Sequence, residues 1–150
     1  MLCLLVVTAC AGSRQARDIG PAEGCYRLRV VDSPAGSGWA ARFPLVLELT
    51  TTSVESARHE AGGTEVYRAF TWEKGERAEY PFRRWSPAGG DSLEAGPGLA
   101  HAGIVLRAHW EDGRIAGRIV PFTDVVAPGD TGPGAADGSF AVRGEAVACR

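Results

Sequence analysis

An Asp-Gly pair at positions 112–113 lies between two runs of alternating apolar and polar residues, and this stretch constrains the fold more than any other. Asp-Gly favours a type I′ turn, because both central residues of that turn need a positive φ. The pair therefore predicts an antiparallel β-hairpin from His101 to Asp124, with Glu111 opposite Arg114. Because side chains alternate along a strand, this register also decides which pairs face the core.

The predicted hairpin has one apolar face and one mostly polar face. Arg107 lies opposite Arg118 on the polar face, so we expect both arginines to point into water, as in an antiparallel pair with one solvated side. The apolar face pairs Ile104 with Pro121, Leu106 with Ile119, Ala108 with Gly117 and Trp110 with Ile115.

The rest of the chain also reads as short strands separated by Gly- and Pro-rich turns, with no convincing helix and no internal repeat. Residues 53–63 fit either a helical turn or a loop, and we take them as loop. About eight strands at this spacing predict an all-β, antiparallel, up-and-down barrel over residues 24–150, with a β-sandwich as the alternative. The predicted strands are 25–32, 43–52, 65–72, 77–85, 92–95, the two hairpin strands and 139–148.

The composition excludes some classes of partner. A chain of 150 residues is long enough for one domain with a real core. Its net charge of -2 gives no electrostatic reason to expect nucleic acid.

The first ten residues are apolar and end in Val7-Thr8-Ala9-Cys10, which resembles a bacterial lipobox. The resemblance implies a lipoprotein signal peptide at 1–9, acylation of Cys10, a flexible tether at 10–23 and a location in the cell envelope, anchored to the bilayer by the acyl chains. No Lys or Arg precedes the apolar run, so another export signal or a buried N-terminal strand are the alternatives.

Two cysteines would remain in the folded part, Cys25 and Cys149. In an exported protein an even pair indicates one disulfide, and the alternative is two buried free thiols. We expect no metal site, because neither cysteine has a second Cys or a His at ligand spacing.

The opening Gly24-Cys25-Tyr26-Arg27-Leu28, the eight strands and the C-terminal Cys resemble a lipocalin or related calycin. In that family G-x-W opens the first strand; Tyr26 stands at the Trp position, and Arg143 is the candidate for the late Arg that packs on it. The lipobox-like start, the Trp85-Ser86-Pro87 turn and the Phe122-Thr123-Asp124 strand end also resemble uncharacterised bacterial envelope proteins.

The lipocalin resemblance implies a non-enzymatic protein, without a cofactor, that binds a small apolar or amphipathic ligand inside the barrel. Core packing would explain the same inward residues equally well, and the alternative function is a structural or assembly protein that binds another envelope protein. The candidate cavity residues are Tyr26, Leu28, Leu106, Ala108, Trp110, Ile115, Gly117 and Phe140.

Gly90-Asp91-Ser92-Leu93 spells the nucleophile block of GDSL-type esterases. That chemistry also needs a D-x-x-H base, and no His of this chain has Asp three residues before it. We therefore interpret Asp91 and Ser92 as turn residues and predict no catalytic residue.

Overall fold

The computed structural model describes residues 22–32, 38–55, 62–123 and 138–150. The predicted signal peptide, Cys10 and most of the tether lie outside these residues, as do 33–37, 56–61 and 124–137. Within the described parts, no helix is long and apolar enough to cross a membrane.

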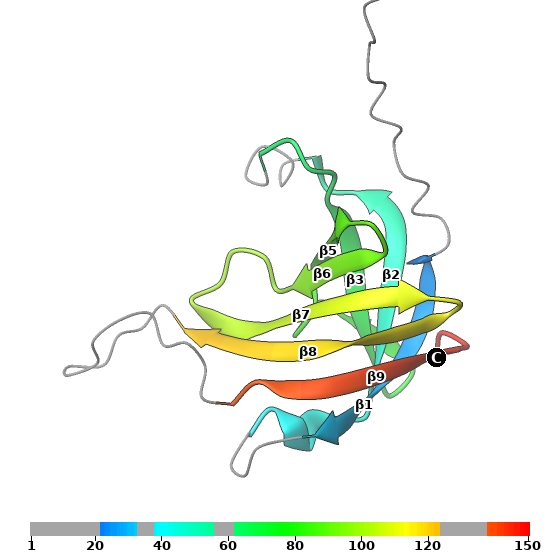
Figure 1. Cartoon of the computed structure of the whole chain (residues 1–150), viewed down its shortest axis with the longest axis vertical. Coiled ribbons are helices and arrows are strands. Elements are labelled where there is room, and N and C mark those ends of the chain that lie inside the picture. The colour runs from blue at the N-terminus through cyan, green and yellow to red at the C-terminus, as the bar shows by residue number, and fades with distance from the viewer. Residues whose placement is uncertain (1–21, 33–37, 56–61, 124–137) are drawn as a thin grey trace, which may run out of the picture.

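Eight antiparallel strands form a closed barrel, and a ninth short strand is attached to it (Figure 1). The ring order is β2-β1-β9-β8-β7-β6-β5-β3, and pairing of β2 with β3 closes it, which decides for the barrel over the sandwich. The elements are β1 (Gly24–Asp32), the 3-10 helix η2 (Ala40–Arg42), β2 (Leu45–Ser53), β3 (Tyr67–Glu73), β4 (Glu76–Ala78), β5 (Arg84–Gly89), β6 (Ser92–Gly96), β7 (Ala102–Glu111), β8 (Arg114–Thr123) and β9 (Phe140–Val147).

The barrel has two different ends. The start of β1 and the turn between β7 and β8 lie at one end, which we call the Tyr26 end. The connection from β1 to β2, which contains η2, and the turn between β3 and β4 lie at the other, which we call the Trp39 end. Figure 1 shows β7, β8 and β9 side by side across the front, with β2, β3, β5 and β6 behind them.

The interior is filled by inward-facing side chains that form one cluster. Alternation of side chains supplies this row from every strand of the ring, so the same period that predicts strands also builds the core. The buried members are Tyr26, Leu28, Leu45, Leu47, Leu49, Ala69, Phe82, Trp85, Leu93, Ala95, Ile104, Leu106, Ala108, Ile115, Ile119, Phe140 and Val142.

The predicted hairpin register is confirmed along the whole ladder from Ala102↔Thr123 to Glu111↔Arg114. Asp112 and Gly113 have φ of 48° and 73°, as a type I′ turn requires. Arg107 and Arg118 are exposed on the outer face. Asp124 itself is outside the described residues.

The single strand predicted over 77–85 is wrong. The chain forms β4, leaves the ladder over residues 79–83, and pairs with β3 again in β5, where Tyr67 lies opposite Trp85. Pro81 lies in this interruption and has no N–H to donate to a ladder, which explains the break. The Trp85-Ser86-Pro87 segment, expected to be a turn, is strand instead, because β5 runs through it and pairs with β6.

The predicted disulfide is present between Cys25 and Cys149, with 5.3 Å between the two Cα atoms. It joins the start of β1 to the chain just after β9, and these two strands are neighbours in the ring. The bridge therefore fixes the two ends of the folded domain to each other at the Tyr26 end.

Candidate ligand site at the Trp39 end

The residues predicted to line a cavity all lie on the inner face of the barrel, but most of them are packed in the core. Tyr26, Leu28, Leu106, Ile115 and Phe140 are each at most 2% exposed. Trp110 packs against the same cluster from its edge. Tyr26, Ile115 and Trp110 fill the Tyr26 half of the barrel instead of enclosing a hollow there, while Phe140 packs in the other half.

The pair of small residues Ala108 and Gly117 also leaves no space for a ligand. A Cβ added to Gly117 would lie 2.6 Å from the Cα of Ala108 and would collide with the carbonyl oxygen of Arg107. The glycine is therefore needed because the backbones of β7 and β8 approach closely, and the absence of its side chain opens no cavity.

An aromatic pair closes the Tyr26 end. The indole Nε1 of Trp110 donates to the Tyr26 hydroxyl at 2.8 Å, and that hydroxyl donates to the carbonyl of Ala22 at 3.0 Å. Burial raises the pKa of Tyr26, and the hydrogen bond from Trp110 opposes this shift. Arg143 is not the packing partner expected from the lipocalin resemblance, because it alternates with the inward Val142 and is exposed on the outer face.

The opposite end carries a hollow of about 240 Å³, which we call the Trp39 hollow. Leu45 and Ile104 form an apolar floor that is continuous with the core. The 3-10 helix η2 and its flanks place aromatic and basic side chains above this floor. The lining residues are Trp39, Arg42, Phe43, Leu45, Glu73, Pro81 and Ile104.

Aromatic contacts fix the wall of the Trp39 hollow. Phe43 packs edge-on against Phe140, with 5.4 Å between ring centroids, and this contact ties the lining to the core. Trp39 and Tyr80 are 5.9 Å apart, and they join η2 to the segment between β4 and β5. The guanidinium of Arg42 lies 4.9 Å from the Trp39 ring centroid and 5.6 Å from that of Tyr80.

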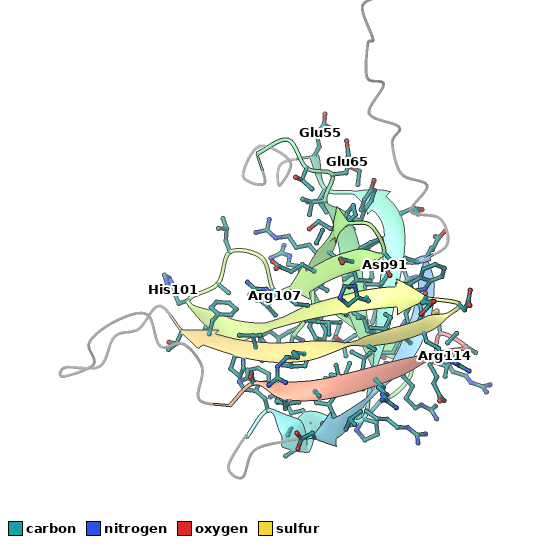
Figure 2. The ribbon with its side chains drawn as sticks, viewed as in Figure 1. Glu55, Glu65, Asp91, His101, Arg107 and Arg114 are labelled. Atoms are coloured by element: carbon teal, nitrogen blue, oxygen red, sulfur yellow. A yellow bond between two sulfur atoms is a disulfide. The ribbon has the colours of Figure 1, made fainter. Side chains whose placement is uncertain are left out.

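The GDSL-like string meets a histidine on the outer surface, but the geometry is not that of a catalytic triad. Ser92 Oγ lies 3.1 Å from His109 Nδ1, and Asp91 Oδ1 lies 3.5 Å from the same nitrogen. A triad needs the nucleophile and the acid on opposite ring nitrogens. Asp91 and His109 are also well exposed, and Figure 2 shows Asp91 at the surface beside β7.

A buried carboxylate lies beside the disulfide on the outer face. Glu48 accepts hydrogen bonds from Trp72 Nε1 at 2.7 Å and from Arg77 Nε at 2.9 Å and Nη2 at 2.6 Å. Its ligand oxygens are within 4.8 Å of the sulfurs of Cys25 and Cys149. Both sulfurs are used in the disulfide, so the only group left to ligate a metal ion among these three residues is the Glu48 carboxylate, which is already paired with Arg77. The contact fixes β4 onto β2 and β3.

The chain matches no family model, no curated protein and no solved structure. The barrel is compatible with a lipocalin-like fold.

Sequence reasoning missed the Trp39 hollow. None of the eight predicted cavity residues lines it, although Phe140 packs on Phe43 and Leu28 lies opposite Leu45, both of which do. The available signal was the string Trp39-Ala40-Ala41-Arg42-Phe43, in which two large aromatic residues and an arginine follow a Gly- and Pro-containing loop. Trp39 lies outside every predicted strand, and a large aromatic side chain there needs burial, which the open end of the barrel supplies.

Proposed function

We propose that the protein is a non-enzymatic binding protein, lipocalin-like in architecture, that holds a small apolar or amphipathic ligand in the Trp39 hollow. The observation that carries the proposal is the difference between the barrel ends: Tyr26 and Trp110 close one, while the other is concave, apolar at its floor and lined with aromatic residues. Binding pockets have this character, with a mainly apolar lining and a few placed polar groups.

The size of the hollow limits the ligand. Its volume of about 240 Å³ is just below the roughly 300–1,000 Å³ of typical small-molecule pockets. A short alkyl chain or a single ring fits on Leu45 and Ile104, and the rest of a larger ligand would project past Trp39 into solvent.

Calorimetric titration of the purified full chain with decan-1-ol tests the proposal. We expect binding to the natural sequence and none to Leu45→Trp, which fills the hollow from its floor. Ala88→Trp adds the same side chain at an exposed position at the Tyr26 end and should bind normally. Thermal unfolding checks that both variants fold. Absence of binding by the natural sequence, or unimpaired binding by a folded Leu45→Trp, contradicts the proposal.

We also propose that the protein is exported and anchored in the cell envelope through acylated Cys10. The lipobox-like residues 7–10 support this, and a disulfide is consistent with an oxidising compartment. Metabolic labelling with a radioactive fatty acid should mark the natural chain and not Cys10→Ser; equal labelling of both would contradict it.

A second candidate function is binding of another envelope protein on the outer face. It is favoured by a groove of about 320 Å³ near β5, β6 and β7, in which Pro97, Val105 and Phe122 contribute apolar surface. Leu99 borders it and is 82% exposed. In intact cells, a photoreactive residue in place of Leu99 should crosslink to an envelope protein. That protein should co-purify with the natural chain and not with Leu99→Ser. Absence of any crosslinked protein would contradict this function.

A further inference from the structure

The guanidinium of Arg42 is a charged group at the Trp39 hollow that pairs with no carboxylate of the described residues. Other exposed arginines make ion pairs, such as Arg107 with Glu94 at 3.0 Å. Arg42 instead contacts the faces of the Trp39 and Tyr80 rings. It lines the hollow together with Glu73, and these two side chains form no ion pair with each other.

Stacking on aromatic faces leaves the hydrogen-bonding capacity of a guanidinium unused. The Arg42 guanidinium carries five N–H donors and lies over both rings, and none of these donors makes a hydrogen bond to the described residues. Two rings therefore hold Arg42 in position without consuming its donors. A carboxylate can accept two parallel N–H bonds from such a fork. Because the two rings already position the group, less side-chain entropy is lost when an anion binds.

The positions of charge and apolar surface define the ligand. The floor at Leu45 and Ile104 is buried and apolar, while Arg42, which lines the same hollow, is exposed. A molecule bound here would place an alkyl or aryl group on the floor and its polar end beside Arg42. We propose that the Trp39 hollow selects apolar molecules that carry one anionic group, a carboxylate above all, and that Arg42 binds this group. This inference rests on the proposed function and adds the class of ligand.

Glu73 is the group that works against this selection, since it lines the same hollow and repels an anion. It lies at the turn into β4 and is exposed, so water screens its charge. Arg42 is held over the hollow by Trp39 and Tyr80, whereas no ring contact or hydrogen bond of the described residues fixes the carboxylate of Glu73. A ligand of opposite charge to Glu73 is therefore the competing possibility that the experiment must include.

The test is a calorimetric comparison of three ligands with one alkyl chain: decanoate, decan-1-ol and decyltrimethylammonium. A charge-assisted hydrogen bond, discounted for the exposed site, predicts that decanoate binds about tenfold more tightly than decan-1-ol. Arg42→Gln should remove that preference, so that decanoate and decan-1-ol bind this variant within about twofold of each other. Arg29→Gln removes an equally exposed arginine on the outer face of β1 and should change nothing.

Each other outcome overturns the inference in a distinguishable way. Equal binding of decanoate and decan-1-ol by the natural sequence leaves the proposed function standing and removes the role of Arg42. Tighter binding of decyltrimethylammonium assigns the selection to Glu73. Loss of decan-1-ol binding in a folded Arg42→Gln would show that Arg42 only supports the wall. Binding of none of the three by the natural sequence removes the proposed function itself.

Discussion

Substitution of Gly117 by Ala tests the close approach of β7 and β8 at the centre of the hairpin. The added Cβ would lie 2.6 Å from both the Cα and the Cβ of Ala108, whereas ordinary contacts begin at 3.4 Å. The strands must therefore separate locally by at least about 0.8 Å, because the carbonyl oxygen of Arg107 lies closer still. Two of the three obstructing atoms belong to backbone, so no change of rotamer relieves the contact.

The expected cost of Gly117→Ala is at the upper end of the range for overpacking a core, about 3 kcal/mol. For a chain of this size that corresponds to a fall in Tm of roughly 10 °C. The free energy of unfolding is measured by urea denaturation followed by tryptophan fluorescence. Gly144→Ala should cost about half as much, because the nearest atom, Leu28 Cδ2 at 2.6 Å, ends a flexible side chain.

Two further variants separate backbone crowding from other effects of alanine. Gly38→Ala is the neutral control, because no atom lies within 4 Å of its added Cβ, and it should change stability by less than about 0.5 kcal/mol. Ala108→Gly combined with Gly117→Ala removes one of the three contacts and leaves the two backbone contacts, so it should recover less than half of the loss. Full recovery, or a Gly117→Ala protein as stable as the natural sequence, refutes the reasoning.

The remaining predictions concern the disulfide and the Tyr26 end. The bridge spans 124 positions, for which the chain-entropy model gives about 5 kcal/mol. Cys149→Ser should therefore lower the free energy of unfolding, measured by urea denaturation, by up to this amount, and a loss below about 1 kcal/mol would contradict the model. The pKa of Tyr26 is raised from its ordinary 10.0 in the folded state, so its stabilising contribution is complete below pH 10 and is lost as pH rises through the folded pKa. Tyr26→Phe should therefore weaken the alkaline loss of stability, although it costs the hydrogen bond from Trp110; an identical alkaline profile would exclude Tyr26 as a source of that loss.

The hairpin is the part of the fold that the sequence determines most completely. Asp112-Gly113 sets the turn, and a fixed turn sets every pair up to Ala102↔Thr123, since strands alternate with a period of two. Closure of the barrel brings the first strand against the last, so the start of β1 lies beside the end of β9, where two cysteines can meet. The break at Pro81 was harder to predict, because the segment on each side of it has strand composition and the ladder resumes after the interruption.

The candidate site could not be predicted because its residues come together only when the barrel closes. Trp39 and Arg42 belong to a connection, Glu73 to the end of β3, and Ile104 to the start of β7. No local period links these positions. The inward row could be listed from alternation alone, but alternation does not tell whether an inward side chain fills the interior or borders a hollow. That distinction depends on volume: the Tyr26 half is filled by large aromatic and branched side chains.

Under the proposed function, the division between the two ends also separates stability from recognition. The disulfide ties β1 to the chain after β9, the hydrogen bond from Trp110 to the Tyr26 hydroxyl ties β7 to β1, and β7 and β8 approach closely at Gly117. Groups constrained in this way cannot move to admit a ligand without losing packing. The Trp39 end is built on a connection whose aromatic residues and Arg42 pack over the barrel floor, where side chains can change without breaking a ladder. Because the Tyr26 half is filled, our proposal places the ligand at the Trp39 hollow, beside Arg42, and not among the residues that alternation selects.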